Sequence, residues 1–476
     1  MRYRLRLVAS ASLALALAVS HAAAENWSRF RGPNGSGIVE DGEYPPELNP
    51  DKNLLWKTAA RPGKSSPVLT ERYVFVTAFD EGKLLTQCFL RQTGELVWER
   101  AEERSREADL HQLNEPAANS PVTDGENVYV LFRDVGLISY DAAGEVRWKT
   151  PFDPLATIMG HGSSPILVGG SIVVQADQSY DGYIAAFDPA NGEIRWKIAR
   201  SGGHGWATPL QYEPTGGSPQ VVTARNGWFA GHRLSDGKQM WESNTLSSAI
   251  VASPVVEGNT VYVFGYGYAP DSGVEGMFSL LDKDEDGMVT REEYTGQAPG
   301  QPWLRALARL EGDRDGVLTQ DEWLTVMRRG ATTAPSSLVA FRFDGSSQSE
   351  ASPRELWRRE RNFMGVIPSA LVYRGVLYLV KNGGILDTLD AETGETLKRG
   401  RLREAIDGYS ASPVAADGKV YFTSEAGKVS VVRAGGEWEV IAVNDLGEEA
   451  FATPALSGGK IFVRTNQSLS CFGKAD

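Results

Sequence analysis

The stretch "SSPILVGGSIVVQADQ" at residues 163–178, with "NGEIRW" at 191–196, contains the pattern that decides the fold of this chain. A Ser-Pro step opens a short apolar run, a β-branched run follows a Gly-Gly turn, and an Asn-Gly-Glu turn leads into a segment that ends in Trp196. Short β-forming runs separated by such turns are typical of antiparallel strands. With the apolar run between them, the unit is expected to form four strands, named A to D in chain order.

The unit recurs along the chain. Copies begin at residues 65, 119, 163, 207, 252, 367, 411 and 452, which makes eight. In four successive copies the prolines that open strand A are 44 or 45 residues apart; they are Pro121, Pro165, Pro209 and Pro254. This length suits one four-stranded blade of a β-propeller. The sequence therefore predicts an all-β fold, an eight-bladed β-propeller of four-stranded blades.

The two ends of the chain are expected to complete one blade together. The eighth copy ends near Cys471 without a strand D, whereas "NLLWKTAA" at 53–60 has the form of a strand D with no blade before it. Pairing these ends closes the ring. The tryptophans of strand D are then expected to pack between blades; they are Trp56, Trp98, Trp148, Trp196, Trp241 and Trp357.

Cys88 and Cys471 are the two cysteines of the chain, and they occupy equivalent strand C positions in neighbouring blades. Packed sheets lie about 10 Å apart, which exceeds the roughly 7 Å between Cα atoms that a disulfide spans. We expect two buried free thiols.

Residues 1–24 have the form of a secretory signal. Three arginines precede a short apolar run, and Ala22, Ala23 and Ala24 supply an A-x-A cleavage site. No later segment approaches the ~20 apolar residues of a membrane span. We expect a periplasmic or secreted monomer, and the net charge of −13 disfavours a nucleic-acid partner.

One copy is interrupted. Its strand B lies at 260–268 and its strand C at 337–343, and residues 271–336 between them divide the propeller into segments 25–270 and 337–476. This insert, in the B–C connection of the fifth blade, is expected to be small and α-helical. In an antiparallel blade that connection lies on the same face as the connections from strand D to strand A, so the insert is expected to cap that face.

The insert contains "LDKDEDGMVTREEYTGQ" at 281–297, in which every ligand position of a calcium loop is filled. The side-chain ligands would be Asp282, Asp284, Asp286, Thr290 and Glu293, with the Met288 carbonyl. A second loop would use Glu311, Asp313, Asp315, the Val317 carbonyl, Thr319 and Glu322. The two loops resemble an EF-hand pair, which implies bound Ca²⁺. Glu311 departs from the Asp that usually opens such a loop, and the alternative for both loops is an acidic loop without an ion.

Other candidate ligands gather where strand D connects to strand A or strand B ends. They are His111, Asn114, His161, Asp177, His204 and Trp206. Three imidazoles on consecutive blades suit a transition metal or a small polar ligand. The alternative is that the Gly-His-Gly sequence shapes a loop whose histidine hydrogen-bonds backbone groups.

The repeats, as in "AAFDPANGEIRW" at 185–196, resemble the pyrroloquinoline-quinone-like (PQQ-like) propeller repeat. That family includes quinoprotein alcohol dehydrogenases and the outer-membrane assembly factor BamB, and "NWSRFRGPNGSGI" at 26–38 is similar to the start of its secreted members. A dehydrogenase would imply PQQ in the funnel, a neighbouring calcium, a catalytic Asp and usually two adjacent cysteines. The chain has no adjacent cysteines and no Asp that matches the motif, so PQQ is disfavoured and no catalytic residue is predicted.

These observations favour an exported, non-catalytic propeller that acts as a binding or assembly scaffold and carries a calcium-binding insert. A protein or peptide partner is expected on the loop-rich face, through exposed side chains that include Arg200, His204, Trp206, Phe363 and Tyr409. The alternatives are a PQQ-dependent dehydrogenase and a carbohydrate-binding propeller.

Overall fold

The computed structural model describes most of the chain. The described residues are 27–104, 110, 114–152, 160–178, 182–200, 205–213, 218–247, 249–266, 278–279, 281–290, 293, 313, 315–329, 336–343, 352–360 and 367–474. Outside them lie the predicted signal at 1–24 and four predicted site residues, His111, His204, Glu311 and Phe363.

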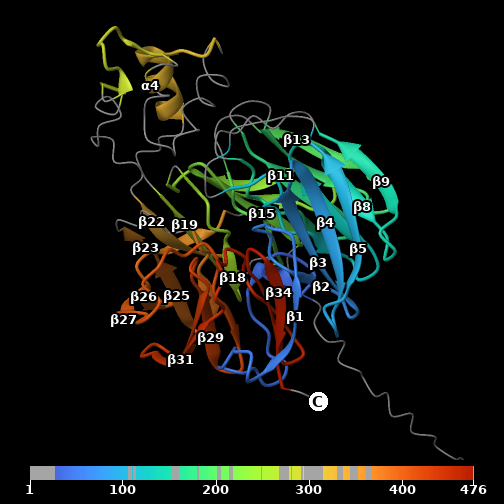
Figure 1. Ribbon diagram of the computed structural model, residues 1–476. Coiled ribbons are helices and arrows are strands. Elements are labelled where there is room, and N and C mark those ends of the chain that lie inside the picture. Colours follow the sequence, from blue (N-terminus) through green and yellow to red (C-terminus); the bar gives the residue numbers. More distant parts are fainter. Residues whose placement is uncertain are drawn as a thin grey trace, which may run out of the picture.

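Eight antiparallel sheets of four strands are arranged as the blades of a propeller (Figure 1). The eight-bladed β-propeller predicted from the repeats is thus confirmed. Blades 1 to 4 consist of β2 (Val68–Leu69), β3 (Tyr73–Asp80), β4 (Lys83–Leu90) and β5 (Leu96–Glu103); β6 (Val122–Thr123), β7 (Val128–Phe132), β8 (Gly136–Tyr140) and β9 (Val146–Pro151); β10 (Ile166–Val168), β11 (Ser171–Ala176), β12 (Gly182–Phe187) and β13 (Ile194–Arg200); and β14 (Leu210–Tyr212), β15 (Gln220–Arg225), β16 (Trp228–Arg233) and β17 (Gln239–Ser243).

Blades 5 to 8 continue the order around the ring. They consist of β18 (Val255–Glu257), β19 (Thr260–Gly265), β22 (Ser337–Arg342) and β23 (Arg354–Glu360); β24 (Leu371–Tyr373), β25 (Val376–Lys381), β26 (Ile385–Asp390) and β27 (Thr396–Arg401); β28 (Val414–Ala416), β29 (Lys419–Thr423), β30 (Lys428–Arg433) and β31 (Glu439–Asp445); and β32 (Ala455–Ser457), β33 (Lys460–Arg464), β34 (Ser468–Phe472) and β1 (Leu54–Ala59).

The N-terminal strand completes the eighth blade, as predicted. Strand β1 pairs antiparallel with β34, so that Trp56 lies opposite Cys471 and Ala59 opposite Ser468. First and last repeats are therefore held in one sheet. Cys88 and Cys471 are both buried and free, which confirms the prediction that they form no disulfide.

A tryptophan of one blade covers a glycine of the next. The Trp148 indole N–H donates to Pro189 O over 3.0 Å, and a Cβ added to Gly192 would lie 2.4 Å from the Trp148 ring. Gly192 has φ +76°, a conformation that L side chains rarely adopt. The same relation joins Trp56 to Gly94, Trp98 to Gly144, Trp196 to Gly237 and Trp357 to Gly394. The predicted packing of these tryptophans between blades is confirmed, and it explains why the C–D turn contains glycine.

The insert leaves the fifth blade between β19 and β22, as predicted. Its described part contains the helix α4 (Gln320–Arg329), the strands β20 (Met288–Val289) and β21 (Leu318–Thr319), and a small core in which Val289, Leu318 and Trp323 are buried. Figure 1 shows α4 outside the ring of blades, beyond the ends of β19 and β22. Within the described residues α4 is the one complete α-helix, so the two helix–loop–helix units remain a prediction. None of the described helices is long and apolar enough to cross a membrane.

Candidate functional site: the central funnel

A closed ring of hydrogen bonds surrounds the propeller axis where strand A begins. In each blade a serine or threonine donates its backbone N–H to the hydroxyl oxygen of its counterpart in the next blade, over 2.9 to 3.0 Å. The members in order are Ser66, Ser120, Ser164, Thr208, Ser253, Ser369, Ser412 and Thr453, which donates back to Ser66. We call this set the hydroxyl ring.

The hydroxyl ring corrects the repeat alignment in one blade. Its member in blade 6 is Ser369, which is followed by Ala370, whereas an alignment on prolines matches Pro368 to the strand A prolines of the other copies. That match is wrong by one residue because "IPSA" offers a proline next to the serine. The hydroxyl, which accepts the inter-blade bond, is what the position requires, and the proline that usually follows it is dispensable.

The N-terminal segment crosses the channel beneath the hydroxyl ring. Arg29 donates to the carbonyl of Pro209 in blade 4, and Arg31 to that of Ala370 in blade 6, each over 2.7 Å. On either side, Leu69 N donates to Trp27 O over 2.8 Å and Ala415 N donates to Gly37 O over 2.8 Å. This plug, residues 27–37, therefore bonds to blades on several sides of the axis. From sequence, the stretch "NWSRFRGPNGSGI" carries a resemblance only, and its structural role is not evident.

Above the plug lies a cavity of about 350 Å³ that opens on the face of the D–A connections. All eight members of the hydroxyl ring line it, and Phe30 of the plug forms its floor. The walls beyond the ring are mostly apolar, with Trp206, Val251, Ile367 and Phe451. We call this cavity the funnel. The signal that could have found it is the Ser or Thr that precedes strand A in every copy.

Lys64 is the charged residue that lines the funnel. Its Nζ lies 4.8 Å from the centre of the Phe451 ring, a cation–π distance. Burial lowers the pKa of Lys64, and the negative charges of Glu115, Glu425 and Glu449 oppose that shift. These carboxylates thus help to keep the ammonium charged.

His161 does not serve as a free ligand. Its Nε2 donates to Gln175 O over 2.8 Å, and its Nδ1 accepts from the Asn119 amide over 3.2 Å. Burial lowers the pKa of His161 to about 4, so the ring is neutral at neutral pH. For His161 the structure bears out the interpretation that a loop histidine bonds backbone groups. His111 and His204, the other imidazoles of the predicted cluster, lie outside the described residues.

Asp177 is buried in an ion pair rather than presented to a ligand. Its Oδ1 lies 2.7 Å from Nη2 of Arg200, and both side chains are almost fully buried. Burial raises the pKa of Asp177, while the charges of Arg200 and Arg225 oppose the shift. Because Arg225 and Thr223, which accepts from Arg200 over 3.2 Å, belong to blade 4, the pair ties blades 3 and 4 together.

Of the five side chains expected on the partner surface, two are in fact buried. Arg200 is 9% exposed because of its pair with Asp177, and Tyr409 is 0% exposed because it packs in the core and donates to Ala405 O. That part of the prediction was wrong. Trp206 and Asn114 do line the funnel, and the Trp206 indole N–H donates to Gly160 O over 3.0 Å.

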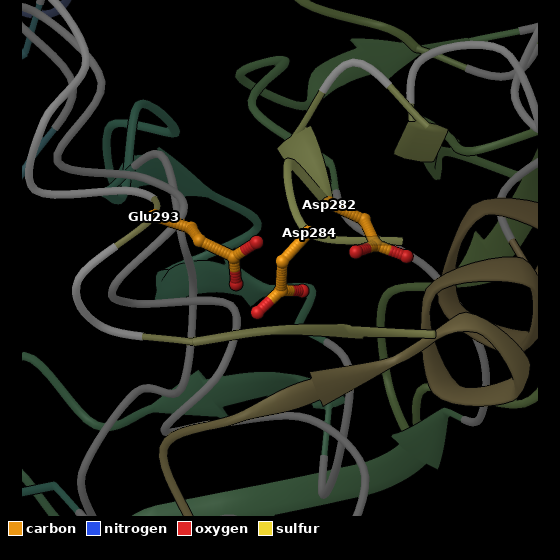
Figure 2. Close-up of side chains that lie close together, drawn as sticks. All are labelled: Asp282, Asp284 and Glu293. Atoms are coloured by element: carbon orange, nitrogen blue, oxygen red, sulfur yellow. The ribbon is translucent and has the colours of Figure 1, made fainter. Parts of the chain in front are cut away.

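Three carboxylates of the insert converge. One ligand atom each from Asp282, Asp284 and Glu293 lies within 4.8 Å of the others, and Figure 2 shows the side chains turned toward one another. Desolvation and the neighbouring charges of Asp286, Glu293 and Asp282 raise the pKa of Asp284. Oxygen donors crowded in this way are the donor set that Ca²⁺ takes.

The first acidic loop also pairs with the second. Val289 lies opposite Leu318, and Met288 opposite Thr319, across β20 and β21. The carboxylate of Glu322 accepts from Thr319 N over 2.9 Å, as that of Glu293 accepts from Thr290 N over 2.6 Å. The two loops therefore have matching local structure around their last acidic residue. Asp286 and Thr290 lie in the first loop, and Asp313, Asp315 and Val317 in the second.

Comparison with known proteins agrees with this architecture. Among curated proteins, the outer membrane protein assembly factor BamB of Burkholderia pseudomallei (strain K96243) is 26% identical over 292 residues, which cover 60% of this chain and 68% of the relative. Among solved structures, BamB from Moraxella catarrhalis superimposes with a TM-score of 0.53 at 12% identity, over 88% of this chain and 96% of that one, and shares the fold.

A quinohemoprotein alcohol dehydrogenase from Comamonas testosteroni gives a TM-score of 0.45 at 13% identity, over 95% of this chain and 81% of that one, which is too low to bear on chemistry. The model of the family described as outer membrane protein assembly factor BamB matches residues 47–179, 87–272 and 180–476. With nearly the whole propeller matched, the chain belongs to the BamB family of PQQ-like β-propellers.

Proposed function

We propose that this protein is an exported scaffold that acts in outer-membrane protein assembly, the role in the name of its BamB relatives. The observation that carries the proposal is the family match, which extends through all blades of the propeller. The predicted signal at residues 1–24 would place the protein in the periplasm, where such an assembly takes place. Its partners would be proteins.

The funnel face is the proposed docking surface. The opposite face has the short A–B and C–D turns, and the D strands begin there. The funnel face instead has the long D–A connections, the cavity and the insert. Ile406, in the D–A connection after β27, is 58% exposed, which is high for a large apolar side chain. Ile406 thus gives an accessible apolar position on this face at which protein contact can be tested.

The test is co-purification of the tagged full chain with outer-membrane assembly subunits of its own host. A matched pair of variants distinguishes the faces: Ile406→Arg changes the funnel face, and Ile194→Arg changes the opposite rim, where Ile194 is 51% exposed. We expect Ile406→Arg to reduce recovery of the subunits and Ile194→Arg to leave it unchanged. Failure of the unmodified protein to recover any subunit would refute the assembly role.

The insert is proposed to bind calcium and to rigidify this face. The convergence of Asp282, Asp284 and Glu293 supports the first loop, and the pairing of β20 with β21 supports a link to the second. Extracellular calcium sites are commonly weak, with Kd near 10⁻⁴ to 10⁻³ M, and serve structure. Calorimetric titration of the full chain with Ca²⁺ tests this, and an absence of binding at millimolar Ca²⁺ would refute it.

A further inference from the structure

The funnel is closed at one end by the plug. The plug crosses the channel beneath the hydroxyl ring, with Phe30 as the floor of the cavity and Arg29 and Arg31 fastened to blades 4 and 6. A ligand can therefore enter from the loop-rich face only. At about 350 Å³ the cavity is at the small end of ligand sites, which span roughly 300–1,000 Å³.

The lining of the funnel is rich in hydrogen-bond donors. Each oxygen of the hydroxyl ring already accepts a backbone N–H from the neighbouring blade. A hydroxyl has one proton of its own to donate, and among the described residues these protons meet no acceptor. The lining residues include no Asp or Glu. The ring thus offers hydroxyl protons to a ligand that accepts hydrogen bonds.

Cations lie at the wall of the funnel and in the plug beneath it. Lys64 lies at its wall, where the carboxylates of Glu115, Glu425 and Glu449 act on its charge. Arg29 and Arg31 lie in the plug beneath the hydroxyl ring, on the carbonyls of Pro209 and Ala370, and do not line the funnel. Arg31 is 0% exposed and Arg29 6% exposed, and in the part of the chain that the structure describes no carboxylate acts on the charge of either. Both guanidiniums have buried N–H groups without a hydrogen-bond partner among the described residues. These groups are Nε of Arg29 and Nε and Nη1 of Arg31. Uncompensated buried cations stabilise a negative charge placed nearby.

The apolar walls define the rest of the ligand. Trp206, Val251, Ile367 and Phe451 line the funnel between the hydroxyl ring and the solvent. A ligand that bonds the ring must pass these side chains, so its body beyond the anionic end has to be apolar or aromatic. Trp206 and Phe451 present aromatic rings, which contribute large contact areas.

We propose that the funnel receives the free C-terminal carboxylate of a protein partner, with an apolar last residue. The inference rests on the proposed scaffold function, in which the ligand is a protein. A loop would enter and leave through one opening and needs room for two chains about 4.8 Å apart, whereas a chain end needs room for one. The carboxylate only accepts hydrogen bonds and matches the donor lining, whereas an amino terminus brings further donors and a positive charge.

The first experiment measures fluorescence anisotropy of a labelled short peptide ending in Phe, added to the full mature chain. The free carboxylate is expected to bind at least about tenfold more tightly than the same peptide with a C-terminal amide, because hydrogen bonds to a charged group are worth this much or more. Equal binding of acid and amide would overturn the proposal. Phenylacetate, the carboxylate without a chain, is expected to compete at least about tenfold more weakly, and equal affinity would mean a small-molecule site instead.

Variants locate the binding. Val251→Trp fills the funnel and is expected to abolish peptide binding, whereas Ile194→Trp, the matched control on the opposite rim, is expected to leave it unchanged. Lys64→Gln is expected to weaken binding about tenfold and Lys64→Arg to restore it. Unaltered binding by Val251→Trp, with folding verified by its circular dichroism, would overturn the proposal.

The failure of this inference differs from the failure of the scaffold function. If outer-membrane assembly subunits co-purify with the unmodified protein but the peptide does not bind, the carboxylate inference is wrong and the scaffold stands. If Val251→Trp abolishes peptide binding and also reduces recovery of the subunits, the funnel is the docking site for the chain end.

Discussion

The backbone N–H of Thr453 in the last repeat donates to the hydroxyl of Ser66 in the first, over 3.0 Å and across 387 residues of sequence. This bond completes a ring of eight. A second contact between the first and last repeats, the pairing of β1 with β34, lies farther from the axis. The propeller is therefore closed twice, near its axis by side-chain oxygens and at its outer edge by a shared sheet.

Loss of one hydrogen bond of the hydroxyl ring is expected to lower the stability of the fold. Ser66→Ala leaves the buried N–H of Thr453 without its acceptor, which is expected to cost about 1–3 kcal/mol of unfolding free energy. Ser66→Thr keeps the hydroxyl, and threonine already occupies the position in blades 4 and 8, so it is expected to cost less than half as much. Urea unfolding of both variants measures the difference. Equal losses would show that volume, not the acceptor, matters at this position.

A side chain added to a glycine that lies under a tryptophan is expected to destabilise the fold. Gly192 has φ +76°, and the Trp148 ring lies 2.4 Å from the place that a Cβ would take, whereas Gly82 has φ +81° and nothing within 4 Å of that place. Gly82→Ala therefore reports the cost of the backbone conformation alone, about 1 kcal/mol. Gly192→Ala adds the displaced indole and is expected to cost at least about 2 kcal/mol more. Thermal or urea unfolding compares the two, and similar losses would contradict the packing argument.

The buried His161 predicts a loss of stability in acid. The pKa of His161 is lowered by burial to about 4 in the folded protein, against about 6.5 when unfolded, so the unfolded state takes up the proton first. The contribution of neutral His161 to the unfolding free energy is fully present above about pH 6.5. It decreases as the pH falls toward 4, by up to about 3 kcal/mol.

His161→Gln removes this term and is expected to flatten the dependence of unfolding free energy on pH between 6.5 and 4. Part of the slope is expected to persist, because burial also lowers the pKa of His232 to about 4. The quantity compared is the slope of unfolding free energy against pH in each protein. A loss of stability that is the same at every pH does not change this slope. An unchanged slope would show that His161 takes up its proton at the same pKa in the folded and unfolded states.

The architecture could be predicted from the sequence because most blades repeat the same local demands. A Ser or Thr before strand A, a glycine in the C–D turn and a tryptophan in strand D are each explained by a contact with a neighbouring blade, and the count of eight follows from their recurrence. The closing strand could be found since Trp56 stands in a strand D with no copy around it. An alignment on prolines misplaces blade 6 by one residue because proline is the more visible signal and the hydroxyl is the necessary one.

The site was harder to predict because its residues depend on contacts distant in sequence. Arg200 and Tyr409 are residue types that are common at protein surfaces, but both are buried. Arg200 pairs with Asp177, and Tyr409 donates a hydrogen bond to Ala405 O. Arg29 and Arg31 reach carbonyls 180 and 339 residues away, so nothing near them in sequence reveals the plug. The predicted calcium loop, by contrast, is local in sequence, and this is why its ligands can be proposed from spacing alone.

The last prediction concerns that loop. Asp282→Ala combined with Glu293→Gln removes two of the three converging carboxylates and is expected to weaken Ca²⁺ binding by the full chain at least about tenfold. Asp321→Asn, an acidic residue of α4 outside the ligand set, is the matched control and is expected to bind as the unmodified protein does.

Calorimetric titration gives the affinities, and far-UV circular dichroism in Ca²⁺ reports the propeller. The β spectrum is expected to be retained in the double variant, because the blades bury their own cores and the insert leaves blade 5 between β19 and β22, which pair with each other from Thr260 to Gly265 without it. Since β20 pairs with β21, loss of the first site is also expected to lower the affinity of the second loop. Collapse of the β spectrum would instead make the insert a condition for folding rather than an addition to a complete propeller.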